Sequence, residues 1–178
     1  MSRLPLRRLV YSALFLAIGI VLPLFTGNIP NIGASLLPMH IPVLLCGFIC
    51  GGGWGAMVGG VLPFLRFLLF GVPLTPIEAA AMCAELLTYG LVSGLVYSMF
   101  KNKSFGAAYV ALITAMLAGR IVWGIASALL FLAFGGNFAF GIFFTAAFAN
   151  ALPGIILQLA IIPAIVSAAQ VFRGSRNL

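Results

Sequence analysis

Long apolar runs follow one another along this sequence, separated by short breaks that are rich in glycine, proline and asparagine. Most runs are roughly 17 to 30 residues long, and about 20 apolar residues allow a helix to cross the hydrocarbon core of a bilayer. The runs are continuous and lack the alternating pattern of the strands of a membrane β-barrel. The sequence therefore predicts an all-α integral membrane protein.

The composition excludes two other classes of protein. Only 6% of the residues are charged and 63% are hydrophobic, whereas soluble domains have about 25% charged residues. A chain of 178 residues is also too short to bury so many apolar side chains in a soluble core. A protein that binds nucleic acid would gather its basic residues on one face, but here the nine Lys and Arg residues are scattered among the apolar runs.

The apolar runs predict six transmembrane helices in one domain over residues 1–178, with no soluble domain. The expected helices span about 9–25, 38–50, 56–70, 77–100, 105–134 and 141–172. The second helix is short, and Pro38 and Pro42 predict an irregular start. The last two helices exceed the thickness of a bilayer, so we expect tilt or kinks, with Pro153 and Pro163 as the expected kink positions.

Seven of the nine cations lie outside the predicted helices. They fall at the N-terminus, between the fourth and fifth helices, and after the sixth: Arg3, Arg7, Arg8, Lys101, Lys103, Arg173 and Arg176. In a six-helix protein these three places face the same side, and the three loops on the other side contain no Lys or Arg. Under the positive-inside rule, we expect a multi-pass protein of the plasma membrane with both termini in the cytoplasm.

Four ionisable residues remain in the middle or outer half of the predicted helices: Arg66, Glu78, Glu85 and Arg120. Charges at membrane depth are costly, and by default they mark a functional site with a specific partner. Glu78 and Glu85 are seven residues apart and share one helix face, with Tyr89 one turn further along. For Arg66 and Glu78, which are close to the outer interface, we favour a salt bridge or snorkelling over ligand contact.

Residues at similar depth predict a pocket that opens to the outside and is lined by Glu85, Tyr89, Arg120, Trp123 and Asn150. The alternative is a buried ion pair between Glu85 and Arg120 that holds the fourth and fifth helices together. The two hypotheses are compatible, because a ligand can bind one side of such a pair. His40 lies at the outer mouth of the second helix, where we favour a capping or loop-anchoring role.

Missing motifs argue against an enzyme. The segment GGGWGAMVGG at 51–60 lacks the lysine of a phosphate-binding loop, so the chain cannot hydrolyse ATP by that mechanism. Two carboxylates and one histidine are too few for metal-dependent membrane transferases or phosphatases. The six predicted helices also lack the half-to-half repeat that is common in secondary transporters. We therefore expect no catalytic residue, metal or cofactor, and a binding subunit that works with an energised partner fits best.

Small residues recur at every fourth position in three places: Gly47, Gly51, Gly55 and Gly59; Gly90 and Gly94; and Ala13 and Ala17. Such faces let helices approach closely in a membrane. We expect most of them to pack helices within the molecule. On the first helix, a docking face for another membrane subunit is an equal alternative.

A basic N-terminus precedes Ala13-Leu-Phe-Leu-Ala17, the stretch LPMHIPVLLCGFICGGGWGAMVGG covers the second and third helices, and AGRIVWG lies in the fifth. In order, spacing and total length, the chain resembles the substrate-binding S-components of energy-coupling factor (ECF) vitamin transporters. The resemblance implies a six-helix protein that captures a water-soluble vitamin or vitamin precursor from outside. It also implies that the protein topples in the membrane while docked on a transmembrane coupling subunit, which two ABC-type ATPase subunits drive.

The resemblance further implies roles for individual residues. Ala13 and Ala17 would face the coupling subunit. The loop 27–37 would be a lid over the ligand, and the loops around 72–76 and 135–140 would add further contacts. This position agrees with the pocket placed from depth alone. The candidate substrate contacts are therefore Glu85, Tyr89, Arg120, Trp123, Asn150, His40, Glu78 and, in the lid, Asn31.

The class of vitamin is open between two alternatives. The four charges at membrane depth sum to zero, so no net field demands a charged ligand. If Glu85 faces the pocket beside Tyr89 and Trp123, it suits a nitrogen heterocycle, such as a pyridoxine-like or ribazole-like compound, which we favour. If Arg120 faces the pocket instead, a carboxylate such as pantothenate, niacin or lipoate fits better. The rival class, a small channel or structural membrane protein, predicts that the purified protein carries no ligand.

Overall fold

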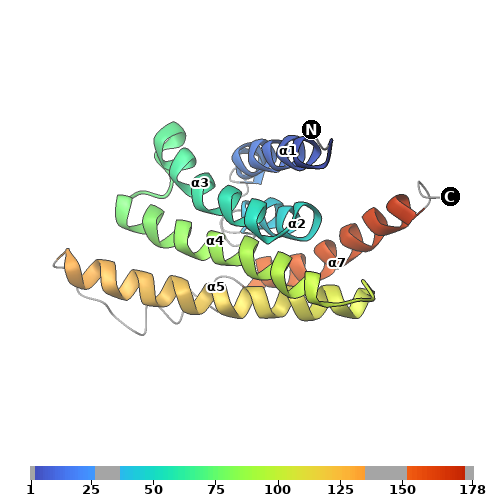
Figure 1. Ribbon diagram of the computed structural model, residues 1–178. Coiled ribbons are helices and arrows are strands. Elements are labelled where there is room, and N and C mark those ends of the chain that lie inside the picture. Colours follow the sequence, from blue (N-terminus) through green and yellow to red (C-terminus); the bar gives the residue numbers. More distant parts are fainter. Residues whose placement is uncertain (1–2, 27–36, 135–151, 175–178) are drawn as a thin grey trace.

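The computed structural model describes residues 3–26, 37–134 and 152–174 (Figure 1). Helices make up most of these ranges, and no strand occurs in them. The helices are α1 (Arg3–Thr26), α2 (His40–Cys50), α3 (Gly52–Phe70), α4 (Pro76–Met99), α5 (Phe105–Ala133) and α7 (Leu152–Gly174). The predicted all-α class is confirmed.

Five of these helices, α1, α3, α4, α5 and α7, are long and apolar enough to cross a membrane. The other helix, α2, has 11 residues and rises only ~16 Å at ~1.5 Å per residue, about half of the hydrocarbon core. It begins at His40 because Leu37 has a left-handed backbone with φ 48°, and Pro38 and Met39 form a turn before the helix. The predicted second span is therefore a helix that crosses only part of a bilayer.

Two helices begin earlier than hydropathy predicts. Helix α1 starts at Arg3 rather than at about residue 9, because arginine is a good helix former and hydropathy marks only the apolar part of a helix. Helix α3 starts at Gly52 rather than at about residue 56. Gly51 alone separates it from α2, with φ 102°, a conformation that glycine adopts most readily. The last predicted helix began at about residue 141, and its residues 141–151 lie outside the described ones.

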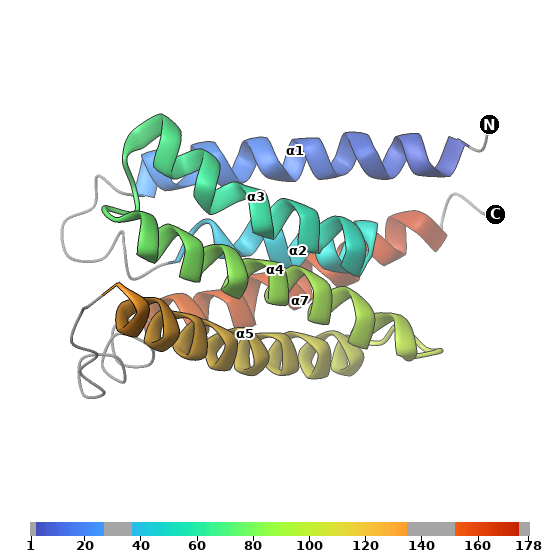
Figure 2. The same cartoon turned by 60° about the vertical axis from the view of Figure 1, so that its left-hand side comes forward.

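The helices lie alongside one another in a single bundle (Figure 2). One end of this bundle contains the start of α1, the end of α7 and the α4–α5 turn. The α3–α4 connection lies at the other end. The α4–α5 turn contains Lys101 and Lys103, and the first turns of α1 contain Arg7 and Arg8. Cations therefore gather at the end that the orientation prediction requires. That this end is cytoplasmic stays a prediction from the positive-inside rule.

Close packing of α2, α3 and α4 depends on glycines, in agreement with the small residues spaced four apart. A Cβ atom at Gly55 would lie 2.7 Å from the carbonyl oxygen of Gly90. A Cβ atom at Gly59 would overlap the backbone at Leu86. Larger residues at these positions would push the helices apart, so the glycines determine how closely α4 is held in the bundle.

The bundle has a buried apolar centre and an apolar outer surface. Its fully buried side chains include Leu44, Leu62, Leu86 and Leu112. Along the outer side of α5, large apolar side chains are exposed instead: Leu117, Ile121, Ile125 and Leu129. Extended exposed apolar rows are rare on soluble proteins, and this surface suits contact with lipid chains.

Candidate functional site

Glu85 lies at the centre of a buried polar cluster to which three helices contribute. It is on α4 and only 2% exposed, and its Oε1 lies 3.2 Å from Nη1 of Arg120 on α5. The same oxygen lies 3.7 Å from Nε2 of His40 on α2, and both partner side chains are buried. The ion pair that the sequence predicts as one alternative is therefore present, with His40 as a third member.

The start of α4 sets the position of Glu85. Pro76 occupies the first turn, and the Thr75 hydroxyl accepts a hydrogen bond of 3.2 Å from the Glu78 N–H, an arrangement typical of a helix N-terminus. Glu85 and Tyr89 follow one turn apart on the same face of the helix, and both are buried. The capped start of α4 thus directs these two side chains into the bundle.

Tyr89 determines how α5 approaches this face of α4. Its ring centroid lies 5.4 Å from that of His40, with the two planes tilted by 57°. On α5, Gly119 leaves room for the Tyr89 ring, since a Cβ atom at this position would overlap it. This close approach brings the next residue, Arg120, beside Glu85.

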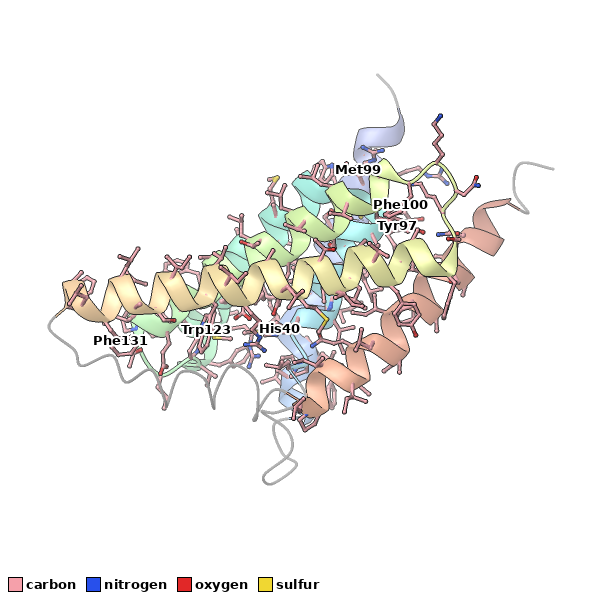
Figure 3. The ribbon with its side chains drawn as sticks, turned by 90° about the horizontal axis from the view of Figure 1, so that it is seen from below. His40, Tyr97, Met99, Phe100, Trp123 and Phe131 are labelled. Carbon is pink, nitrogen blue, oxygen red and sulfur yellow. The ribbon has the colours of Figure 1, made fainter. Side chains whose placement is uncertain are left out.

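Trp123 is the aromatic member of the cluster with the most exposed ring. It is half-buried, and its ring centroid lies 5.8 Å from the Arg120 Cζ, a cation–π distance. In Figure 3, His40 and Trp123 lie along the same stretch of α5, away from the labelled Tyr97 and Phe100 near the start of that helix. Its indole ring is more exposed than the Tyr89 ring, which is only 1% exposed.

Several buried atoms of the cluster have no hydrogen-bond partner among the described residues. These atoms are Nδ1 and Nε2 of His40, Nε and Nη2 of Arg120, and Oε1 of Glu85. The carboxylate oxygen thus approaches its two neighbours without hydrogen-bond geometry. A buried polar group without a hydrogen bond costs about 1–3 kcal/mol, so the described side chains do not satisfy this cluster by themselves.

Arg66 differs from what the sequence predicts for it. Arg66 is 8% exposed, and its Nη1 lies 3.9 Å from the Met39 sulfur. Its Nε has no hydrogen-bond partner among the described residues. Both ion pairs found there are made by Glu85, and Arg66 takes part in neither. The predicted salt bridge or snorkelling of Arg66 is therefore wrong, because the side chain points inward to the start of α2. Glu78, in contrast, is exposed in the first turn of α4.

The charge balance of the cluster also differs from the predicted one. Because Glu78 is exposed, the buried charges are those of Arg66, Arg120 and Glu85. They sum to one positive charge, before any charge on His40, instead of zero. The stretches 27–36 and 135–151 contain no ionisable side chain, so they leave this balance unchanged.

The remaining predicted contacts divide into two groups. Asn31 and Asn150 lie outside the described residues. For His40, where we favour a capping or loop-anchoring role, the capping part is wrong, and the loop 27–36 lies outside the described residues. The residue at the cap position of α2 is Met39, which makes no side-chain cap bond, and the His40 ring lies against Glu85 and Tyr89 instead.

Two of the buried polar residues that did not enter the predicted contacts have a side-chain nitrogen without a hydrogen-bond partner among the described residues. Arg66 is one of them, and Gln158 on α7 is the other, since it is 1% exposed and its Nε2 lacks a hydrogen-bond partner in the described part of the chain. A polar residue inside an apolar run is a signal that the sequence does carry. The sequence does not show how each helix is rotated about its own axis, and this rotation decides which side chains point inward.

Ala13 and Ala17, the predicted docking residues, are exposed and lie one turn apart on α1. Other residues form the inner side of this helix, among them Ser12, whose hydroxyl lies 3.5 Å from the Cys46 sulfur, and the buried Gly19. The two alanines therefore do not pack α1 onto the described helices, and their face is open to another subunit.

The cluster offers a carboxylate, an imidazole, a guanidinium, a phenol and an indole. No group of three His, Cys, Asp or Glu side chains that could hold a metal ion occurs within the described ranges, and we assign no metal or cofactor site. A few convergent polar groups in apolar surroundings are typical of a site that recognises a small molecule.

A family model described as "ECF transporter, substrate-specific component" matches residues 7–166. This range runs from α1 into α7 and includes every residue of the buried cluster. Comparisons with curated proteins and with solved structures show no match.

Proposed function

Because the chain belongs to the substrate-specific components of ECF transporters, we propose that it binds a water-soluble vitamin or vitamin precursor at the cluster around Glu85. Members of this family are multi-pass proteins of the plasma membrane, and they work as non-catalytic partners of an ECF coupling subunit and of ATPase subunits. The proposed main contacts are Glu85, Arg120, His40 and Trp123, with Tyr89, Glu78, Asn31 and Asn150 as further candidates.

This proposal rests on one observation: several polar atoms at the buried ion pair have no hydrogen-bond partner among the described residues. A pair kept only to join two helices would find its hydrogen bonds within the protein, because the penalty for burying both charges is large. Here Nε and Nη2 of Arg120, and both ring nitrogens of His40, lack partners among the described residues. A bound ligand with polar atoms would supply hydrogen bonds to these groups.

The short helix α2 supports the same location. Helix α2 runs toward the bundle end that carries the α4–α5 turn (Figure 2), and its first residue lies only ~16 Å back from its last one. If that end is cytoplasmic, His40 lies at about half the depth of the bilayer, on the outer side. A water-soluble molecule from outside would then reach the cluster without crossing the whole membrane.

A nitrogen heterocycle and a carboxylate remain the two candidate classes of ligand. Tyr89 packs against His40 and is almost fully buried, so its ring is a poor stacking surface. Among the described residues of the cluster, stacking of a heterocycle would therefore depend on Trp123. Glu85, the group that would bind a heterocycle nitrogen, is already next to Arg120, and both facts weaken the first class.

Mass spectrometry of the purified protein tests the proposal. The protein is extracted from membranes in a mild detergent and denatured, and the released small molecules are identified. We expect one vitamin-sized molecule per protein chain. The variants Glu85→Gln and Arg120→Ala should release far less of it, while Lys103→Gln, which changes an exposed side chain outside the site, should carry as much as the unchanged protein.

Two results would count against different parts of this proposal. A small channel or structural membrane protein would carry no such molecule and would bind none of a panel of vitamins in titration calorimetry, and the proposed function would then be wrong. If a ligand is found but Glu85→Gln and Arg120→Ala bind it as tightly as before, the function stands and the proposed site is wrong.

A further inference from the structure

The buried charges leave one cation without an acidic partner. Glu85 lies beside Arg120, at 3.2 Å, whereas the described contact of the Arg66 guanidinium is with the Met39 sulfur. The sequence has only one other acid, Glu78, and this residue is exposed. A charge at membrane depth without a counter-charge is costly, so a ligand that brings one negative charge is favoured over a neutral one.

Arg120 presents an unused edge that fits a specific chemical group. Its Nη1 faces Glu85, while Nε and Nη2, which form one edge of the planar guanidinium, have no hydrogen-bond partner in the described part of the chain. Two parallel N–H donors on such an edge match the two oxygens of a carboxylate. A ring nitrogen of a neutral heterocycle would accept only one of these hydrogen bonds.

The start of α2 adds to the positive potential of the cluster. The N-terminus of a helix carries a partial positive charge, and in α2 no side chain caps it. Its cap residue Met39 contacts Arg66, and its first residue His40 contacts Glu85. The helix terminus and the two arginines therefore act on the same small region.

We infer that the ligand is a monocarboxylate, whose carboxylate binds the Nε and Nη2 edge of Arg120 while Arg66 compensates its charge. This inference rests on the proposed function and narrows it to one class of substrate. It reverses the preference for a nitrogen heterocycle, which rested on Glu85 facing the pocket, while the predicted charge balance of zero left both classes open. It also makes Arg66 a residue that determines which molecules are accepted.

The first test compares acids with neutral analogues of nearly the same shape. The purified protein is titrated in a calorimeter with pantothenate against pantothenol, nicotinate against nicotinamide, and lipoate against lipoamide. Pyridoxine and ribazole serve as heterocycles without a carboxylate, and any molecule that co-purifies is added to the panel with its own amide. The bound acid should have an affinity at least about 100-fold above that of its neutral analogue, because the neutral group leaves buried donors unpaired.

Variants of the two arginines separate charge from geometry. Arg66→Gln should weaken binding of the acid by about 10-fold to 100-fold and leave binding of the neutral analogue unchanged. Arg66→Lys should keep most of the affinity, since it keeps the charge. Arg120→Lys should lose most of the affinity, because lysine lacks the planar edge. Lys103→Gln removes an exposed cation at the other end of the bundle and is the matched control.

Arg66→Gln is the decisive variant, because it removes no partner from either ion pair of the described residues and thermal unfolding can verify its fold. Equal affinity for acid and neutral analogue would overturn the inference. The inference would also be overturned if a molecule without a carboxylate bound most tightly. It would be overturned as well if the folded Arg66→Gln variant bound the acid as tightly as the unchanged protein. Each of these results would leave the proposed function intact, whereas a protein that binds no small molecule at all would overturn the proposed function itself.

Discussion

Glu85 makes both ion pairs found among the described residues, one to α2 and one to α5. The attachment of α4 to its two neighbours thus involves a single carboxylate in the centre of the bundle. Removing one member of a buried pair leaves the other charge uncompensated, whereas removing both members together is often far less harmful. This difference separates the structural contribution of the pair from its contribution to ligand binding.

The variants Glu85→Gln and Arg120→Gln should each lower the free energy of unfolding of the ligand-free protein by about 3–5 kcal/mol. The double variant should lose less than the sum of the two, with a coupling energy on the order of 1–3 kcal/mol. Denaturant titration in detergent micelles, followed by tryptophan fluorescence, measures these differences. Glu78→Gln, the control at an exposed site, should change the free energy of unfolding by less than about 0.5 kcal/mol. Strict additivity of the two losses would show that the residues do not stabilise each other.

The predictability of the cluster differs from residue to residue. Glu85 and Arg120 could be brought together from the sequence, because counting residues from the end of a span gives the height of each side chain in the membrane. Arg66 was assigned to the interface by the same counting, yet it is buried. Height does not tell which way a helix is rotated, and for α3 the rotation follows from backbone contacts such as that of Gly55 with Gly90.

At the scale of helices, hydropathy predicts the spans better than their ends. An apolar run must be helical in lipid, because a helix satisfies its own backbone hydrogen bonds. The ends depend on single residues that hydropathy does not weigh, such as Gly51 between α2 and α3, or Leu37 before α2. The consequence is largest for α2, since the late start at His40 is what places this side chain beside Glu85.

Helix α1 carries Ala13 and Ala17, the residues at which the sequence predicts docking of the coupling subunit. Ala13→Trp and Ala17→Trp should abolish vitamin uptake by cells that also produce the coupling subunit and the ATPases, because an indole blocks the close helix approach that small residues permit. Ligand binding to the purified variants should be unchanged, since both positions are exposed and away from the cluster. Uptake of labelled ligand and titration calorimetry measure the two properties separately.

The matched control is Ala160→Trp, which places the same indole at an exposed position on α7. It should preserve both uptake and binding. Loss of binding in Ala13→Trp or Ala17→Trp would mean that these alanines support the fold. Full uptake by both variants would mean that the coupling subunit docks elsewhere.

At the scale of the whole molecule, the charges form two groups that have different consequences. The net charge of +7 equals the number of cations at the termini and in the α4–α5 turn, because the single positive charge of the buried cluster and the negative charge of Glu78 cancel. The net charge therefore predicts orientation and gives no information about the ligand. The sign of the ligand follows from the cluster alone, where Arg66 has no acidic partner in the described ranges.

Orientation can be tested with one cysteine at each end of the bundle. Leu74, in the α3–α4 connection, is 85% exposed, and Lys103 is exposed in the α4–α5 turn. The native Cys46, Cys50 and Cys83 are first replaced by alanine. A membrane-impermeant maleimide applied to intact cells should label Leu74→Cys and not Lys103→Cys. After the membrane is made permeable, both variants should react.

The reverse labelling pattern would place the cations outside, against the positive-inside rule, and would turn the side of the bundle nearest His40 toward the cytoplasm. A binding subunit for uptake needs its site accessible from outside, so this result would contradict the proposed direction of transport as well as the topology. Labelling of both positions in intact cells, with a folded protein, would mean that the bundle does not separate the two ends across the membrane. The labelling pattern of these two cysteines thus tests the orientation that the positive-inside rule predicts, and with it the side from which the ligand enters.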